Sequence, residues 1–312
     1  ATIKVQDGCN SFCSFCIIPH LRGTSRSRHP DAVVEEVRRL VDAGFLEIVL
    51  SGVHLQDYGE DISPRTSLVE LLDRVSSIAG LERLRLSSLG PRAFTSELLD
   101  LLSRPVFCRH WHIPLQAGSD AVLEIMRRGY SAREFEEVTS ALQSRFVDPA
   151  ITTDVIVGHP GESADRFEET LRLSERVGFA RIHVFPFSFR EGTLSAKLWT
   201  RDAVPPAEIR RRVDALTSLE ANLGRAYRER WVGKVVDVLI EGGVRGEEGF
   251  LQGLTDRYVR VRFRAPSPFA LERFPGRIEP VRVRSLVAGG GEVEGVWCGE
   301  PVGIAEESGS RS

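Results

Sequence analysis

The segment TIKVQDGCNSFCSFC (residues 2–16) decides how this chain is interpreted, because it joins a strand-like stretch directly to three closely spaced cysteines. Cys9, Cys13 and Cys16 have the spacing C-x3-C-x2-C, and three soft thiolates on one short loop suit a soft metal centre. A [4Fe–4S] cluster usually takes four cysteines, so three would leave one iron open to bind and activate a small molecule. A zinc site with His20 as the fourth ligand is the alternative.

Strand-like and helical patterns alternate after this loop, as far as about residue 187. Short apolar strands are predicted at 2–6, 47–51, 81–86, 110–113, 151–157 and 181–185. Helical periodicity is found at 31–43, 68–78, 96–102, 120–127, 133–144 and 165–177. Parallel βαβ units with right-handed crossovers predict a closed or open α/β barrel, with function at the carboxyl ends of its strands.

The last third of the chain has a different pattern. Residues 205–230 predict a long Arg-rich helix with a break near Gly224, and after Trp231 the strands are short and separated by Gly and Pro. That pattern is typical of a small all-β barrel. Its strands are expected at 234–241, 249–254, 259–263, 279–285 and 302–305. We therefore divide the chain into an α/β core (1–204), a helical connector (205–230), a β-barrel (231–306) and a disordered tail (307–312).

Composition excludes several classes of protein. The 312 residues are 42% hydrophobic and 27% charged, which is ordinary for a folded globular chain and not for a disordered one. There is no membrane-spanning stretch and no apolar signal core, so we expect a cytoplasmic monomer without a membrane association. Five cysteines without a signal sequence argue against a disulfide framework, and we expect Cys108 and Cys298 to be small buried side chains.

The cysteine loop resembles that of the radical S-adenosylmethionine (SAM) enzymes, and further segments are similar to their methylthiotransferase branch. The QDGC opening, the IIP after the third cysteine and FPFSFREGT most resemble the subgroup that modifies N6-threonylcarbamoyladenosine in tRNA. The resemblance implies a partial (β/α)6 TIM-like barrel followed by a small all-β barrel similar to a TRAM domain, which binds RNA. The matching segments after the cysteine loop are SGVHLQDYG (51–59), LRLSS (84–88), HIPLQAGSD (112–120), ITTDVIVGHPGE (151–162) and FPFSFREGT (185–193).

The resemblance also implies a reaction. A [4Fe–4S] cluster on Cys9, Cys13 and Cys16 would bind SAM, and an electron from a flavodoxin- or ferredoxin-type reductant would cleave it to a 5′-deoxyadenosyl radical. The radical would permit insertion of a methylthio group at C2 of N6-threonylcarbamoyladenosine next to the anticodon. The C–H bond at that carbon is too inert for acid–base catalysis. No catalytic side chain is identified. The residues expected to bind SAM are Phe15, Ser51, Gly52, Ser88, Gln116 and Ile156.

Two groups of arginines are candidates for tRNA binding. The first follows the cysteine loop in a segment without acidic residues, so it would lie near the mouth of the barrel. The second alternates with apolar residues on a predicted strand, which places its members on one face. In each case the alternative is a solvated surface without a partner. The first group is Arg22, Arg26 and Arg28, and the second is Arg260, Arg262 and Arg264.

The chain departs from the family pattern at several points. Gly90 stands where the family usually has Glu, and His159 where it usually has Phe; a lone loop histidine is more often structural than catalytic. Full-length members carry an N-terminal domain whose three cysteines hold an auxiliary [4Fe–4S] cluster, and we expect the chain as given to lack this sulfur-donating site. Two alternative functions stay open: a methylthiotransferase acting on a ribosomal-protein aspartate, and a non-catalytic, metal-bearing RNA-binding fragment.

Overall fold

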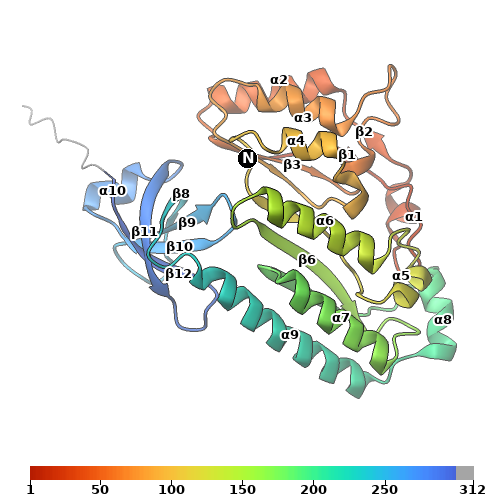
Figure 1. Cartoon of the computed structure of the whole chain (residues 1–312). Coiled ribbons are helices and arrows are strands. Elements are labelled where there is room, and N and C mark those ends of the chain that lie inside the picture. Colours follow the sequence, from red (N-terminus) through yellow and green to blue (C-terminus); the bar gives the residue numbers. More distant parts are fainter. Residues whose placement is uncertain (300–312) are drawn as a thin grey trace, which may run out of the picture.

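Six parallel strands of the α/β part curve into an open barrel in the structure, a computed structural model that describes residues 1–299 (Figure 1). They form two sheets of order β2-β1-β3-β4 and β5-β6-β7, joined by a parallel bridge between Leu84 and Phe107. All six predicted strands are present, and the short β2, antiparallel to β1, is an addition. The strands are β1 (Thr2–Asp7), β2 (Arg26–Ser27), β3 (Glu47–Gly52), β4 (Arg83–Leu86), β5 (His110–His112), β6 (Ala150–Val157) and β7 (Arg181–Pro186).

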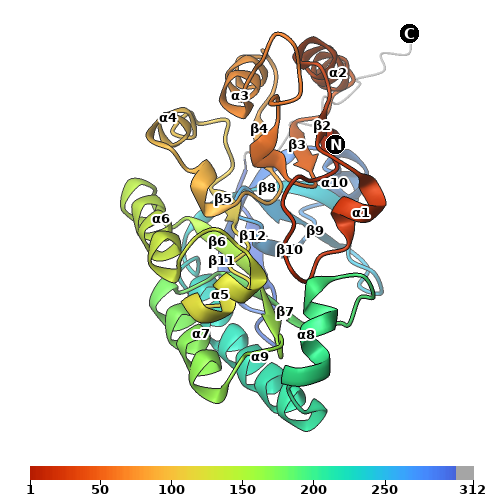
Figure 2. The same ribbon diagram turned by 90° about the vertical axis from the view of Figure 1, so that its right-hand side faces the viewer.

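Helices cover the outer face of these strands (Figure 2). Local sequence starts several of them: α3 and α6 each begin with a capping box, formed by Ser67 with Glu70 and by Ser131 with Glu134. The short helices α1 and α8 were not predicted. The helices are α1 (Ile18–Arg22), α2 (Pro30–Asp42), α3 (Leu68–Ser76), α4 (Ser96–Leu101), α5 (Asp120–Met126), α6 (Ala132–Arg145), α7 (Ala164–Val177), α8 (Leu194–Asp202) and α9 (Pro206–Glu229), with 3-10 turns η1 (Leu55–Asp57) and η2 (Pro91–Ala93).

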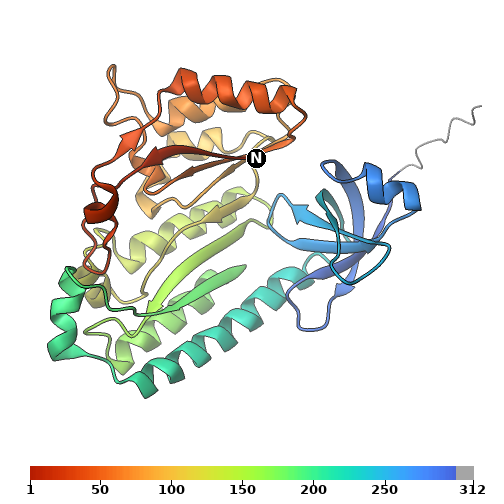
Figure 3. The same ribbon diagram turned by 180° about the vertical axis from the view of Figure 1, so that it is seen from behind.

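Helix α9 is continuous, so the predicted break at Gly224 is wrong (Figure 3). Gly224 is buried where the helix crosses the start of β7, and a Cβ there would lie 3.2 Å from the carbonyl oxygen of Ala180. The glycine therefore permits close packing of helix against strand rather than ending the helix. Among residues 1–299, no helix has both the length and the apolar character needed to cross a membrane.

The C-terminal part is a closed barrel of order β10-β12-β11-β8-β9. Its strand β12 was not predicted, because Gly295 interrupts the apolar alternation; a Cβ there would clash with Val281 of β11. The strand expected at 302–305 and the tail at 307–312 lie outside the described residues. The elements are β8 (Val235–Gly243), β9 (Phe250–Thr255), β10 (Arg260–Arg264), α10 (Pro268–Arg273), β11 (Ile278–Leu286) and β12 (Val293–Trp297).

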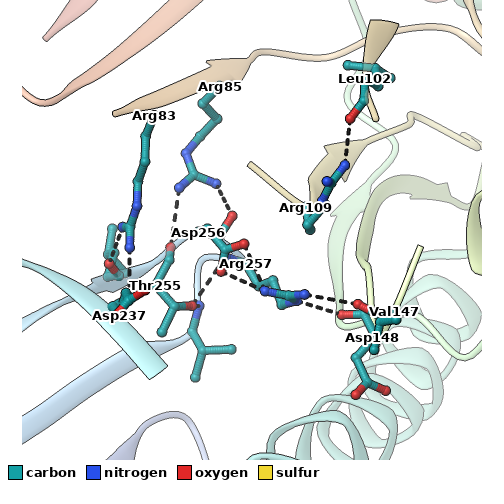
Figure 4. A network of polar contacts seen from close by, with 12 residues as sticks. Arg83, Arg85, Leu102, Arg109, Val147, Asp148, Asp237, Thr255, Asp256 and Arg257 are labelled. Atoms are coloured by element: carbon teal, nitrogen blue, oxygen red, sulfur yellow. Dashed lines mark hydrogen bonds and ion pairs between the residues drawn. The ribbon is translucent and has the colours of Figure 1, made fainter. Parts of the chain in front are cut away.

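The C-terminal barrel docks against the amino ends of the α/β strands (Figure 4). Arg83 and Arg85 of β4 are only 6% and 2% exposed, and Arg85 Nε donates to Glu47 Oε1 at 2.9 Å. Their remaining donors bind main-chain carbonyls of the barrel, which closes this end of the strands and leaves the carboxyl ends open. These bonds are Arg83 to Asp237 (2.8 Å) and Leu254 (3.1 Å), and Arg85 to Asp256 (3.0 Å) and Thr255 (3.3 Å).

Candidate functional site

The three cysteines lie on the loop between β1 and α1, at the open end of the strands and away from the C-terminal barrel (Figure 1). All three are free thiols; Cys9 is buried, whereas Cys13 and Cys16 are partly exposed. Main-chain hydrogen bonds hold the loop at several points. They run from Cys9 N to Gly23 O (3.1 Å), from Ser14 N to Met126 O (3.0 Å) and from Cys16 N to Cys13 O (3.1 Å).

The buried side chain of Gln6 connects this loop to the loop that follows β3. Its Nε2 donates to Gly8 O at 2.8 Å and to Ser25 Oγ at 2.9 Å, and its Oε1 accepts from His54 N at 2.8 Å. The sequence interpretation gave Gln6 no role of its own. The sequence does contain a pattern that could have predicted such a role: Gln6 is a polar residue at the end of an apolar strand, two positions before a loop glycine.

Hydrogen-bond donors already point at two of the cysteine sulfurs. Ser11 N donates to Cys9 Sγ at 3.3 Å, and Arg128 NH1 donates to Cys13 Sγ at 3.2 Å. Burial raises the pKa of the Cys9 and Cys16 thiols, so a bound metal must displace their protons to gain thiolate ligands. Donors of this kind stabilise metal-bound thiolates, which fits the loop to a metal centre.

The donor set fits an iron–sulfur cluster better than a single zinc ion. A zinc ion needs all its ligands within about 2.3 Å of one point. In the described part of the chain, the three cysteines and His20 are not among the groups whose ligand atoms all lie within 4.8 Å of one another. His20 is exposed, with its ring 6.0 Å from that of Phe12. In a cluster each thiolate binds a different iron, so wider spacing is expected.

The six residues expected to bind SAM all belong to the same open edge of the barrel, and all are partly exposed. Ser51 and Gly52 end β3, Ser88 follows β4 and Gln116 follows β5, while Ile156 lies near the end of β6. Phe15 belongs to the cysteine loop itself. The fold thus brings the set together from distant parts of the sequence, and contact with SAM stays a prediction.

Two of these positions have unusual local geometry. A Cβ on Gly52 would lie 2.9 Å from Gln6 Oε1, so a glycine is needed where the two loops meet. Gln116 has φ of 66°, a conformation that is uncommon for residues other than glycine. Its N–H donates to Asp154 O (2.8 Å) and its carbonyl accepts from Ile156 N (2.9 Å), so pairing with β6 maintains this backbone conformation. Strained backbone of this kind is concentrated at functional sites.

The space beside Gly90 is occupied by Gln56. Gln56 Oε1 accepts a hydrogen bond from Gly90 N at 3.0 Å, and a Cβ on Gly90 would clash with that oxygen. A glutamate at this position would therefore require Gln56 to move. Both residues line a cavity of about 280 Å³ next to Cys13, whose wall also includes Arg128.

His159 is a structural residue, as the sequence interpretation favoured. It is fully buried, its Nε2 lies 2.7 Å from Ser195 Oγ, and its ring packs against those of Phe15 and Phe187. Burial lowers its pKa to about 4. Ser195 Oγ donates in turn to Ser14 Oγ at 2.8 Å, so this buried group joins the cysteine loop to α8.

A polar group inside the barrel was not singled out from the sequence. His112 on β5, Asp154 on β6 and His183 on β7 have side-chain ligand atoms that all lie within 4.8 Å of one another. His112 Nε2 is 3.1 Å from Asp154 Oδ2, and its Nδ1 is 3.0 Å from Thr152 Oγ1. The sequence pattern that could have predicted this group is an alternation along the strands. Polar residues occupy every second position, and the side chains between them pack outward against helices.

The structure gives most of the candidate RNA-binding arginines carboxylate partners. Near the mouth, Arg22 and Arg26 lie 3.2 Å and 3.9 Å from Asp7. On β10, Val261 and Phe263 are buried and the arginines share the opposite face, as predicted. The other ion pairs are Arg28–Glu36 (2.6 Å), Arg260–Glu241 (2.8 Å), Arg262–Glu247 (2.6 Å) and Arg262–Glu294 (2.7 Å).

The two remaining cysteines differ from each other. Cys108 is buried, as predicted, and burial raises its pKa to about 12. Cys298 is exposed just after β12, so the prediction of a buried side chain is wrong there. The strand that ends at Trp297 turns this residue to the surface of the barrel, and neither cysteine belongs to the loop that carries the other three.

Comparisons with known proteins agree with this geometry. Residues 3–174 match the family model of the radical SAM superfamily. The chain is 37% identical over 93% of its length to threonylcarbamoyladenosine tRNA methylthiotransferase MtaB of Bacillus subtilis, covering 63% of that protein. It is 38% identical over 84% of its length to tRNA-2-methylthio-N(6)-dimethylallyladenosine synthase of Moorella thermoacetica, covering 62% of it. The chain thus spans about three fifths of the curated relatives that it matches.

Solved structures are similar in fold. The radical SAM methyltransferase TsrM of Kitasatospora setae, solved with cobalamin and a [4Fe–4S] cluster, superposes with a TM-score of 0.52 at 20% identity, over 63% of this chain and 38% of that one. Coproporphyrinogen III oxidase (HemN) of Escherichia coli, a radical SAM enzyme, gives 0.50 at 15% identity, over 72% of this chain and 52% of that one. At such identities the likeness concerns the fold alone.

Proposed function

This chain belongs to the radical SAM superfamily, and from that premise we propose that it is a tRNA methylthiotransferase that acts at C2 of N6-threonylcarbamoyladenosine next to the anticodon. The observation that carries the proposal is the loop of Cys9, Cys13 and Cys16 at the open end of the barrel. Relatives named for threonylcarbamoyladenosine and for dimethylallyladenosine are equally similar. The QDGC and FPFSFREGT segments support the first substrate.

Each group of residues at the open end has a part in this proposal. A [4Fe–4S] cluster with SAM bound would supply a 5′-deoxyadenosyl radical, which can activate an inert C–H bond. The three cysteines would hold the cluster, and Gln6 fixes the loop that carries them. Phe15 and Ile156 would pack against the adenine of SAM, and the polar residues at the strand ends would hold its other groups. These contacts orient the reacting atoms and exclude water.

We place the substrate base inside the barrel, against His112, Asp154 and His183. They share the interior face of the β5-β6-β7 sheet with Ile156, and Asp154 is two residues before it on β6. Within the described residues, the ring nitrogens of His183 have no hydrogen-bond partner, so they are available to a ligand. Three polar side chains on adjacent rigid strands form a defined surface for the polar edge of a base.

The C-terminal barrel is proposed to hold the tRNA backbone through β10. Arg264 is exposed and has no carboxylate within 4.0 Å among residues 1–299, whereas Arg260 and Arg262 are paired. A free cation contacts phosphate without first breaking an ion pair. Arg22, Arg26 and Arg28 at the mouth form the second proposed contact, where a tRNA that reaches the cysteine loop must pass.

Anaerobic reconstitution with iron and sulfide tests the proposal in two steps. The loaded protein should show a broad absorbance near 400 nm that dithionite bleaches, and it should release 5′-deoxyadenosine from SAM when a flavodoxin or ferredoxin supplies electrons. tRNA carrying N6-threonylcarbamoyladenosine should increase that release, as measured by liquid chromatography and mass spectrometry. Colourless protein with one bound zinc would contradict the first step and favour a non-catalytic RNA-binding protein. A response to dimethylallyladenosine tRNA or to a ribosomal protein instead would contradict the substrate.

A further inference from the structure

Arg128 reaches the cysteine loop from the end of α5. Its NH1 donates to Cys13 Sγ at 3.2 Å, and the side chain is partly buried. Among residues 1–299, no carboxylate lies within 4.0 Å of its guanidinium, whereas Arg22, Arg85 and Arg212 each have such a partner. The group that Arg128 meets in place of a carboxylate is a cysteine sulfur.

The position of this guanidinium is fixed by Tyr130. Arg128 Nε donates to Tyr130 Oη at 3.1 Å, and the guanidinium carbon lies 5.2 Å from the centre of the tyrosine ring. The buried Tyr130 hydroxyl is in turn within hydrogen-bond distance of the carbonyls of Pro114 (2.7 Å) and Leu115 (3.1 Å), which follow β5. Arg128 is therefore held against the loop by a rigid part of the barrel.

The turn that carries Arg128 is also attached to the loop through its backbone. Met126 O accepts from Ser14 N at 3.0 Å, one residue after Cys13. Arg127 has φ of 57° and Gly129 has φ of 69°, so the backbone is left-handed on both sides of Arg128. Arg127 itself is exposed and makes no side-chain hydrogen bond among the described residues. Of these two adjacent arginines, Arg128 contacts the sulfur and Tyr130, whereas Arg127 contacts neither through a side-chain hydrogen bond.

The electrostatic consequence follows from charge. A hydrogen bond and a positive charge at a cluster ligand stabilise the reduced cluster, which carries one more electron, relative to the oxidised cluster. The effect is larger in a partly buried site than in water, because the effective dielectric constant is lower. We propose that Arg128 is a positioning residue that raises the reduction potential of the cluster bound by Cys9, Cys13 and Cys16. This rests on the proposed function only in requiring that the cluster binds.

The test compares Arg128→Met with Arg127→Met, its matched control on the same turn. Both variants and the unaltered protein are loaded anaerobically, and the reduced cluster is followed by electron paramagnetic resonance during a redox titration without tRNA. At a fixed potential, the ratio of reduced to oxidised cluster should fall at least tenfold in Arg128→Met, which for a one-electron couple is a midpoint about 59 mV lower. Arg127→Met should match the unaltered protein.

Arg128→Gln is a second variant, which keeps an N–H donor and removes the charge. Its midpoint should shift in the same direction by a smaller amount. A midpoint equal to that of the unaltered protein in either loaded variant overturns the proposal. Loss of the cluster from both Arg128→Met and Arg128→Gln also overturns the proposal if Arg127→Met has normal iron content. Arg128 would then serve only to form the loop. Failure of the proposed function would be seen separately, as an unaltered protein that binds no cluster or ignores tRNA.

Discussion

Arginine side chains have different roles at the two ends of the α/β strands: they close the amino ends and border a cavity at the carboxyl ends. At the amino ends, Arg83 and Arg85 are buried and their donors are satisfied by Glu47 and by main-chain carbonyls of the C-terminal barrel. At the carboxyl ends, Arg128 donates to a cysteine sulfur and borders a cavity. The difference shows that a second domain closes one end, whereas loops of the same barrel leave the other end accessible to ligands.

The closed end is completed by the turn between β9 and β10. Tyr258, with φ of 59°, lies with its ring 4.1 Å from the guanidinium carbon of Arg85 and 4.6 Å from the ring of His110 on β5. Arg257 donates to the carbonyls of Val147 (3.0 Å) and Asp148 (2.9 Å), just before β6 (Figure 4). Contacts with β4, β5 and the start of β6 make the two domains one structural unit.

The largest expected effect is at the open end. Cys13→Ala should abolish the absorbance near 400 nm and reduce 5′-deoxyadenosine release to background, because a cluster needs all three thiolates of this loop. Its free energy of unfolding without iron should change little, since Cys13 makes no disulfide. Cys298→Ala is the matched control. Normal iron content in Cys13→Ala would exclude the loop as the cluster site.

The next effect is at the closed end. Arg85→Met should lower the free energy of unfolding by about 4 kcal/mol, because it removes the 2.9 Å hydrogen bond to the carboxylate of Glu47 and the donor to the carbonyl of Asp256. Arg26→Met, at the exposed mouth, should change it by less than about 0.5 kcal/mol. Urea unfolding followed by circular dichroism measures both. Equal changes in the free energy of unfolding for the two substitutions would contradict the stabilising role of the buried arginines at the closed end.

A third prediction concerns pH at the junction of the cysteine loop and α8. His159 has an ordinary pKa of 6.5 when unfolded and about 4 when folded, so the unfolded chain binds the proton first as pH falls. Lowering the pH from 7 to 4 should therefore reduce the free energy of unfolding by about 3 kcal/mol through the protonation of His159 in the unfolded chain. His159→Phe should remove this contribution, as measured by urea unfolding at both pH values. Parallel pH curves for the two proteins would refute the assignment.

The smallest effect is expected on the C-terminal barrel. Arg264→Gln should weaken tRNA binding severalfold and reduce the slope of log affinity against log salt by about 1, as for the loss of one phosphate contact. Arg262→Gln should change the slope less, because Glu247 and Glu294 already neutralise this arginine. Binding is measured by filter retention over a range of salt. A larger slope change for Arg262→Gln would reverse the proposed order.

Patterns of neighbouring residues were sufficient for much of the fold. The six strands of the α/β part, most of its helices and the cysteine loop all follow from periodicity and spacing within about fifteen residues, because local propensity and side-chain burial act at that range. Strand β12 and the continuity of α9 could not be predicted in this way. At Gly295 and Gly224 the glycine permits a close approach to Val281 of a neighbouring strand and to Ala180, contacts that are formed only when the elements pack together.

By itself, the sequence determined that three thiolates occur on one loop after a first strand, and that the chain has an α/β part followed by a β part. The tertiary structure alone decided which groups surround those thiolates. It placed Arg128 on Cys13, brought His112, Asp154 and His183 together inside the barrel, and gave Arg262 its carboxylates. Spacing along the chain fixes which ligands share a loop, whereas charge and hydrogen bonding act through space, and the distances that control them exist only after folding.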